Sequence, residues 1–432
     1  MIPILDLAVA EDQIRVVQLL AQLRLDSAQA GQPAYAAVEQ ILKDVHARGD
    51  DAAVESCRKF DDPNFSASQI RVAIAEMAEA AKRVPAEQLS AIRRSIAQVR
   101  QYQIHLMPKD PPPLVRKGVE LGMRFTPLES AGLYFPGGKA SYPSSLIMLA
   151  VPAQVAGVKQ IVVCTPPSKY GRTDLVLAAC HELKLTEVFR AGGAAAIAAM
   201  AFGTQTIPRV DKIVGPGNIY VQLAKRAVAG FVGIDGILGP SEILVLADES
   251  ANPRFIAADM LAQAEHDPGS AILLTDSRRL ADAVADQIKI QIEPLSRRAA
   301  AEKALAEHSA IIVGKSIDEL IPLADEFAAE HVNIQTRDDQ AVLKKLRNAG
   351  AIFLGPYSAV AAGDYVAGPS HCLPTNTTAR FSSGISVYEF LKRSSVVRYD
   401  ASGLRGDAQA IETLAEAEHL DAHAQSIRIR KD

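Results

Sequence analysis

The feature that most constrains the fold is a regular alternation of short apolar runs and helical stretches that begins near Gly132. Strands that alternate with helices build βαβ units, and these units require a parallel sheet. Continuous apolar strands are typical of sheets that helices cover on both faces. The sequence therefore predicts an α/β protein with doubly wound, Rossmann-like parallel sheets. The runs expected to form strands are residues 160–165, 186–190, 211–214, 243–247, 271–275, 310–313 and 351–354.

The number of strands favours two doubly wound sheets over one large sheet. We expect the two sheets to join near residues 245–255, and the first 120 residues to be mainly helical, because apolar residues recur three and four apart there. Helices are expected at 35–48, 86–103, 174–183, 194–202, 220–229, 255–265 and 317–329. The expected parts are a helical region at 1–120, α/β domains at 121–248 and 249–380, and a C-terminal tail at 381–432.

The tail shows no repeating strand pattern. Its sequence predicts helices near 387–393 and 407–419, followed by a strand at 426–430. Some 50 residues are too few for an independent core. We expect the tail to pack on another domain or on a second subunit.

Charge and hydropathy argue against several classes of protein. The formal net charge is -4 and no long basic run occurs, which disfavours a nucleic-acid binder. No apolar stretch approaches the roughly 20 residues that a membrane-spanning helix needs, and the first residues do not resemble a secretory signal. We therefore expect a cytoplasmic protein without a membrane partner. The four cysteines form no Cys-x-x-Cys pair, which excludes zinc-ribbon and thioredoxin-like sites.

Four glycine-containing turns follow or flank the expected strands, at residues 135–139, 191–194, 215–218 and 239–242. Glycine lets the backbone approach a phosphate, and the N-terminus of a following helix favours an anion. However, the sequence contains neither a Gly-x-Gly-x-x-Gly fingerprint nor a P-loop. Taken alone, these turns are explained better as tight turns than as a dinucleotide site.

Histidines and carboxylates gather in the C-terminal half of the chain. Six of the nine histidines follow residue 260. Each one alone is explained at least as well by a helix end or by a polar surface, and for Glu330-His331 the two explanations are equal. Together their nitrogen and oxygen atoms suit a divalent metal such as zinc. The segments that carry them are Gln263 to His266, the pair Glu330-His331, Asp364 to His371, and Glu418 to His423. We expect the segment from Asp364 to His371 to be a loop that follows a strand.

At these residues the chain resembles the histidinol dehydrogenases, from about residue 35 to the end. The motifs are long and specific, so chance agreement across all of them is not credible. They are PLESAGLY at 127–134, PGGK at 136–139, YPSS at 142–145, VDKIVGPGN at 210–218, GPSE at 239–242, QAEH at 263–266, EH at 330–331 and ARFSSG at 379–384.

The resemblance implies a zinc site, a substrate pocket, a cofactor site and a homodimer. One zinc ion per subunit would be held by Gln263, His266, Asp364 and His423, the last supplied by the tail of the other subunit. The substrate pocket would comprise Ser241, Gln263, His266, His331, Asp364, His371, Glu418 and His423. The NAD contacts would be Tyr134 and Asn218, with Ala195 at a position where most members have glutamine.

The family reaction implied is the oxidation of L-histidinol to L-histidine through L-histidinal, with reduction of two NAD molecules, at the end of histidine biosynthesis. In this reaction His331 takes the alcohol proton as a neutral base, and Glu330 then activates water to attack the aldehyde. The metal mainly holds the substrate in position.

Some positions depart from the family pattern. Ala195 replaces the usual glutamine, Asn333 replaces a common acidic residue, and Asn376-Thr377 replaces a common Gly-Gly pair. Residues 236–238 also differ from the usual pattern. None of these is a catalytic or metal position, but they leave room for altered cofactor affinity or an altered substrate.

Three alternatives stay open from the sequence. A paralogue of the same family would oxidise another small alcohol, such as a sulfonated diol, but the negative charge of Glu418 favours the ammonium group of histidinol. An aldehyde-oxidising enzyme would use Cys372, beside His371, as its nucleophile. A catalytically silent metal-binding module would make the Glu330-His331 pair incidental.

Overall fold

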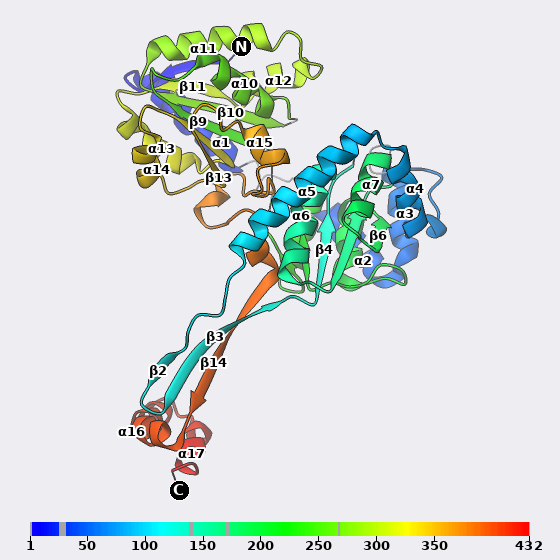
Figure 1. Ribbon diagram of the computed structural model, residues 1–432, viewed down its shortest axis with the longest axis vertical. Coiled ribbons are helices and arrows are strands. Elements are labelled where there is room, and N and C mark those ends of the chain that lie inside the picture. The colour runs from blue at the N-terminus through cyan, green and yellow to red at the C-terminus, as the bar shows by residue number, and fades with distance from the viewer. Residues whose placement is uncertain are drawn as a thin grey trace.

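The computed structural model describes residues 2–25, 32–137, 141–168, 173–237, 239, 241–266 and 268–431. Figure 1 shows two α/β bodies, each built on a parallel sheet, and a long arm that extends from them. The α/β class and the two parallel sheets expected from the sequence are confirmed. No helix in the described part of the chain is long and apolar enough to cross a membrane.

The first parallel sheet has five strands in the order β6-β5-β4-β7-β8. Chain order reverses between β4 and β7, which makes their carboxyl ends the switch point of the sheet. The strands are β4 (Ser130–Tyr134), β5 (Gln160–Thr165), β6 (Glu187–Arg190), β7 (Lys212–Val214) and β8 (Gly233–Ile234). The helices between them are α6 (Pro143–Ala156), α7 (Asp174–Glu182), α8 (Gly193–Phe202) and α9 (Ile219–Val228).

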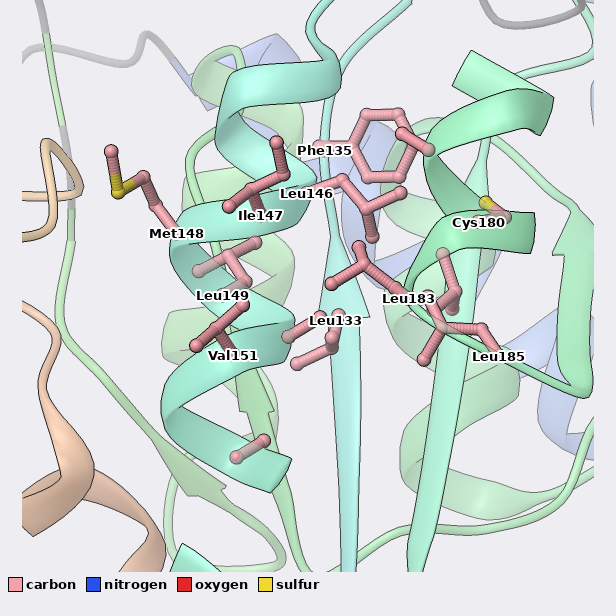
Figure 2. Close-up of a cluster of buried hydrophobic side chains, with 14 of the residues drawn as sticks. Leu133, Phe135, Leu146, Ile147, Met148, Leu149, Val151, Cys180, Leu183 and Leu185 are labelled. Carbon is pink, nitrogen blue, oxygen red and sulfur yellow. The ribbon is translucent and has the colours of Figure 1, made fainter. Parts of the chain in front are cut away.

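The core of this body is densely apolar because α6 and α8 are apolar on every face, as expected of fully buried helices. Figure 2 shows Leu146 of α6 gathered with Leu133 of β4, Phe135, Leu183 and Leu185. This packing fixes the ends of β4 and α6, and both ends carry residues that later form part of the site.

The second parallel sheet has six strands in the order β1-β11-β10-β9-β12-β13. Its strands are β1 (Ile4–Asp6), β9 (Ser241–Ala247), β10 (Gly269–Thr275), β11 (Ala310–Val313), β12 (His331–Gln335) and β13 (Ala351–Leu354). Its helices are α1 (Ala10–Leu25), α10 (Pro253–Ala264), α11 (Arg278–Gln291), α12 (Arg298–Glu307), α13 (Ile317–Phe327), α14 (Asp339–Lys345) and α15 (Val360–Tyr365).

The remaining N-terminal helices cover the first sheet. Apolar side chains of α2, such as Val38, Leu42 and Val45, share a core with α8 and α9, and α4 packs along α7. These helices are α2 (Gln32–Arg48), α3 (Asp50–Phe60), α4 (Ile74–Arg83) and α5 (Ala86–Leu106), with a short 3-10 turn η1 (Ala67–Gln69).

The arm is a three-stranded antiparallel sheet in the order β14-β3-β2. The strands β3 and β14 pair along their whole length, from Pro127 with Leu391 to Val119 with Tyr399. The arm carries two helices at its far end, well away from both parallel sheets (Figure 1). Its elements are β2 (Leu114–Arg116), β3 (Val119–Pro127), β14 (Leu391–Tyr399), α16 (Ala401–Ala417) and α17 (Asp421–Arg428), preceded by 3-10 turns η2 (Thr378–Arg380) and η3 (Val387–Phe390).

The structure differs from the sequence expectations in its long-range pairing. The strand β9, expected in the first α/β domain at 121–248, pairs with β10 and β12 of the second sheet. Residues of the N-terminal region expected to be helical form the strand β1, which pairs with β11 at the edge of that same sheet. The helix expected near 387–393 is a short 3-10 turn, Val387–Phe390, that leads directly into strand β14. The strand expected at 426–430 lies in or beside helix α17. Local periodicity carries no information about which strands pair, because hydrogen bonding in a sheet joins segments distant in the chain.

Candidate active site

The candidate site lies at the amino ends of two neighbouring strands of the second sheet. Ser241 is the first residue of β9, and His331 is the first residue of β12. These strands run parallel and pair directly, with His331 opposite Ile243. Glu330 precedes β12, so its side chain reaches the same edge. The sequence had left Glu330-His331 equally consistent with a helix C-terminus, whereas the pair is buried at a strand start.

Glu330 is held in place by two donors of the Ser241-Glu242 segment. Its Oε2 atom accepts hydrogen bonds from the Ser241 hydroxyl at 2.8 Å and from the Glu242 backbone N–H at 2.9 Å. Ser241 Oγ also lies 2.6 Å from Oε1 of Gln263, so its single proton is shared between two acceptors. Gln263, near the end of α10, is thereby tied to the Glu330 carboxylate through one hydroxyl group.

His331 lies between two carboxylates and is nearly inaccessible to solvent. Its Nδ1 atom is 3.0 Å from the Glu242 carbonyl oxygen and 3.4 Å from Oε2 of Glu330. Its Nε2 atom is 3.5 Å from Oδ1 of Asp364 and, among the described residues, has no hydrogen-bond partner. A buried nitrogen without a hydrogen-bond partner is costly, so this atom is available to a group that could bond it.

Burial by itself lowers the pKa of His331, but the negative charges of Glu330 and Asp364 outweigh it and raise the pKa to about 10. These two carboxylates therefore favour the protonated imidazole, whereas the role as base that the resemblance implies requires the neutral form. Burial raises the pKa of Asp364. The contact with His331 outweighs this effect and holds the pKa below its ordinary value.

Asp364 and His371 link this edge to the first sheet. Asp364 belongs to the short helix α15, rather than to the loop expected from the sequence. Nδ1 of His371 lies 2.8 Å from the Asp364 carbonyl oxygen, and its Nε2 lies 3.0 Å from the Ser145 hydroxyl in the first turn of α6. The chain enters α6 from the carboxyl end of β4. The carboxyl edge of the first sheet thus meets the amino edge of the second.

His266 completes the group of donors near α10 and α15. It is partly buried, and burial lowers its pKa while the charges of Glu330 and Asp364 oppose that effect. Gln263, His266 and Asp364 supply two kinds of oxygen donor and one nitrogen donor, a set that suits a borderline divalent metal. Among the described residues, no group of three or more His, Cys, Asp and Glu side chains forms a metal site by itself.

The structure does not bring Glu418 and His423 to this group within one chain. Both are exposed, Glu418 at the end of α16 and His423 in α17. These helices lie at the far end of the arm, on the opposite end of the molecule from the second sheet (Figure 1). The resemblance assigns the tail to the site of the partner subunit, so these two residues are not expected in the site of their own chain.

The residues expected to contact NAD have unequal exposure. Asn218 is exposed, and its side chain accepts hydrogen bonds from the backbone N–H groups of Tyr220 and Val221 at the start of α9. Tyr134 is buried, and its hydroxyl accepts a hydrogen bond from Gly193 N–H at 3.1 Å. Ala195 belongs to α8, and its methyl group is fully buried in the core of the first body.

Glu242 is a buried residue of the site to which the sequence assigned no role. Its side chain accepts a hydrogen bond from the backbone N–H of Asn376 at 2.9 Å. Burial raises its pKa to about 8, and the nearby charge of Glu330 adds to this effect. The residue lies in the GPSE motif, yet nothing in the sequence shows that its side chain is buried beside a second carboxylate.

We expect the substitution Glu242→Gln to change the pH dependence of stability. The folded pKa is raised, so the neutral carboxyl stabilises wild type fully below about pH 4.5, and this contribution is lost as pH rises towards about 8. Glutamine is neutral throughout. The variant should therefore gain stability relative to wild type between pH 5 and pH 8, by on the order of a few kcal/mol. Melting temperatures across this pH range measure the effect.

The matched control for this experiment is Glu326→Gln, which removes an exposed carboxylate from α13. Its stability relative to wild type should change little with pH, because solvent screens an exposed charge. If the melting temperatures of wild type and Glu242→Gln differ by the same amount at every pH, Glu242 is ionised throughout this range and its pKa is not raised.

Asn376 and Thr377 both adopt left-handed backbone conformations, with φ of 53° and 63°. The family resemblance implies glycine at both positions, and glycine adopts positive φ without steric cost. Asparagine tolerates this region, whereas β-branched threonine is strained there. The adjoining turn is also tight, because a side chain at Gly239 would meet Nδ2 of Asn376.

We expect Thr377→Gly to stabilise the protein by about 1 kcal/mol, since it removes this strain. A rise in melting temperature would measure the effect. The control is Thr413→Gly in the exposed helix α16, where the same replacement should destabilise by a similar amount because the backbone there is helical. A drop in melting temperature for both variants would mean that Thr377 is not strained.

Cys372 is buried, and burial raises the pKa of its thiol. A thiol acts as a nucleophile only in its thiolate form. The environment of Cys372 therefore disfavours the alternative in which this residue attacks an aldehyde.

Comparisons with known proteins agree along nearly the whole chain. A family model described as histidinol dehydrogenase matches residues 25–431. The chain is 47% identical to a histidinol dehydrogenase from Synechococcus over 92% of both chains, and 49% identical to one from Bradyrhizobium diazoefficiens over 91% and 92%. The crystal structure of histidinol dehydrogenase from Elizabethkingia anophelis matches with a TM-score of 0.89 at 36% identity, over 93% of each chain. The chain therefore belongs to the histidinol dehydrogenase family of NAD-dependent oxidoreductases.

Proposed function

We propose that this protein oxidises L-histidinol to L-histidine through L-histidinal and reduces two NAD molecules. The observation that carries the proposal is the buried Glu330–His331 pair, with the free Nε2 of His331 directed towards Asp364. The overall change is R–CH2OH + H2O + 2 NAD+ → R–COO− + 2 NADH + 3 H+. It therefore requires a base for the alcohol proton, a base for water, and a cofactor close to the reacting carbon.

We assign the alcohol proton to Nε2 of His331 and the activation of water to the Glu330 carboxylate. Removal of the alcohol proton requires neutral His331, although its pKa is raised to about 10. Asp364 is one of the two carboxylates that raise this pKa, so engagement of Asp364 by a cation would favour the neutral imidazole. Ser241 and the backbone of Glu242 keep the Glu330 carboxylate oriented during both steps.

We propose that Gln263, His266 and Asp364 hold one zinc ion per subunit, with the fourth protein ligand supplied by the partner subunit's His423. Zinc at this position would supply positive charge that fixes the imidazole and amine of histidinol next to His331. His371, held between Asp364 and Ser145, would then contact the substrate from the side of the first sheet.

A homodimer with exchanged tails accounts for the exposed apolar surface of the arm. Val115 and Val397 are 71% and 64% exposed, and Leu414 of α16 is 65% exposed. Apolar surface of this kind favours coverage by another protein surface. In such a dimer, Glu418 and His423 of one tail would reach the second-sheet edge of the other chain, and the Glu418 carboxylate would pair with the histidinol ammonium group. The same charge would oppose the sulfonate of a sulfonated diol.

We place NAD at the carboxyl edge of the first sheet, beside the turn that follows β7. This is the switch point between β4 and β7, where open α/β sheets bind ligands. Asn218 is exposed there, at the N-terminus of α9. The contact between Ser145 and His371 brings this edge close to the proposed substrate.

NADH formation from L-histidinol, before and after removal of metal, tests the proposed function. We expect two NADH per histidinol, loss of this activity on chelation, and recovery with zinc. A folded, zinc-loaded protein that forms no NADH from histidinol would refute the assigned substrate. The next substrates to examine would then be other small alcohols, including sulfonated diols.

A further inference from the structure

A buried ion pair between Lys225 and Asp235 lies beneath the turn that follows β7. Lys225 is in α9, and Asp235 comes directly after β8. Their side chains are only 2% and 1% exposed. Within the described part of the chain, neither residue forms a hydrogen bond or ion pair with the proposed substrate residues. The family resemblance assigns neither of them a role.

Both members of the pair also bond the backbone of one residue, Gly215. Lys225 Nζ donates to the Gly215 carbonyl oxygen at 2.9 Å, and Gly215 N–H donates to Oδ2 of Asp235 at 2.8 Å. Gly215 has a φ of 121°, and a Cβ atom there would lie 1.9 Å from the Tyr134 carbonyl oxygen. The ion pair therefore fixes both polar groups of a residue whose conformation only glycine adopts easily.

Stability alone gives a poor explanation for this pair. Removing two charges from water costs several kcal/mol per ion, and apolar replacements of buried ion pairs are often as stable or more stable. The contacts of the pair are instead specific, since they converge on the single residue where β7 ends and the turn into α9 begins.

The position of Gly215 connects the pair to cofactor binding. Gly215 follows β7, next to Tyr134 at the end of β4, so it lies at the switch point of the first sheet. Three residues later, Asn218 begins α9 with its side chain exposed. Displacement of Gly215 would move this turn and the N-terminus of α9 together.

We infer that Lys225 and Asp235 are positioning residues for the nicotinamide dinucleotide: they hold the turn at 215–218 in the conformation that binds it. This inference rests on the proposed function, because it takes the NAD site from there. The buried pair lies outside the substrate site, and it sets the affinity for NAD because it holds this turn. A displaced turn would weaken cofactor binding and misplace the nicotinamide relative to the substrate.

The test measures NAD affinity by titration of the full-length, zinc-loaded protein without histidinol. The main variant is the double substitution Lys225→Met and Asp235→Asn. It removes both charges together, because a single substitution would leave one buried charge unpaired. We expect the variant to fold and to bind NAD about tenfold or more weakly, with zinc content and KM for histidinol unchanged.

A second variant, Gly215→Ala, displaces the turn without altering the charges, because its Cβ atom meets the Tyr134 carbonyl oxygen. It should weaken NAD binding to a similar extent. The matched control is Lys212→Met with Glu389→Gln, which removes a partly buried ion pair at the opposite end of the same strand β7. The control should retain wild-type NAD affinity even if its melting temperature falls.

Wild-type NAD affinity in the folded double variant, or in Gly215→Ala, would overturn the inference. Equal weakening in the Lys212–Glu389 control would also overturn it, since the effect would then follow from general destabilisation. If the wild-type protein binds NAD but does not oxidise histidinol, only the assigned substrate is refuted. The comparison of NAD affinities then still decides the role of the pair. A wild-type protein that binds no NAD would refute both the inference and the cofactor assignment.

Discussion

Replacement of His331 by asparagine should lower kcat for L-histidinol by about 10²- to 10⁴-fold, the usual contribution of a positioned acid–base group. Asparagine keeps a polar side chain at the start of β12 but cannot accept the alcohol proton. The loss should be larger for histidinol than for histidinal, because only the first oxidation begins from an alcohol. Steady-state rates with both substrates, together with circular dichroism to verify folding, measure this difference.

Glu330→Gln should show the opposite preference. Its amide cannot activate water, so oxidation of histidinal should fall more than the first hydride transfer from histidinol. A single-turnover experiment with histidinol would then give about one NADH per site before the reaction slows. The control is His181→Asn, which alters an exposed histidine of α7 and should leave both rates unchanged. Near-normal rates for His331→Asn or Glu330→Gln would remove that residue from the proposed chemistry.

A mixture of two inactive variants should recover activity if tails are exchanged between subunits. His331→Asn damages the site on the second sheet, whereas His423→Ala damages the tail. Within one chain these residues lie at opposite ends of the molecule (Figure 1). In a heterodimer with exchanged tails, one site contains both substitutions and the other contains neither. Random pairing of equal amounts would therefore restore about one quarter of the wild-type activity.

The experiment requires co-expression or joint refolding, so that subunits pair at random. Mixing His331→Asn with Glu330→Gln is the matched control, because both substitutions affect the same half of each site and no pairing gives an intact site. Recovery in the first mixture and none in the control would support exchange of tails. No recovery in either mixture, with heterodimers demonstrated by differential tagging, would mean that His423 serves the site of its own chain or none.

The position of the site was only partly predictable from the sequence. Glu330, His331, Ser241, Gln263, His266 and Asp364 do meet at one edge of the second sheet, and the family resemblance implied a role for each of them. The motifs gave no indication that Glu242 is buried with a raised pKa, or that His331 lies between two carboxylates. Both properties arise from side chains that the fold brings together from distant segments, which local sequence patterns do not encode.

The sequence by itself determined most strands and helices of the two α/β bodies, and it indicated the family of this protein. Apolar runs such as 160–165, 310–313 and 351–354 form strands with the expected bounds, because the local spacing of apolar residues distinguishes strands from helices. The tertiary structure decided which strands pair, and it placed β1 and β9 in the second sheet and 391–399 in the arm. It also buried Lys225 with Asp235 against Gly215. Such pairings depend on contacts between distant residues, whose free energy is set by burial and hydrogen bonding in the whole fold.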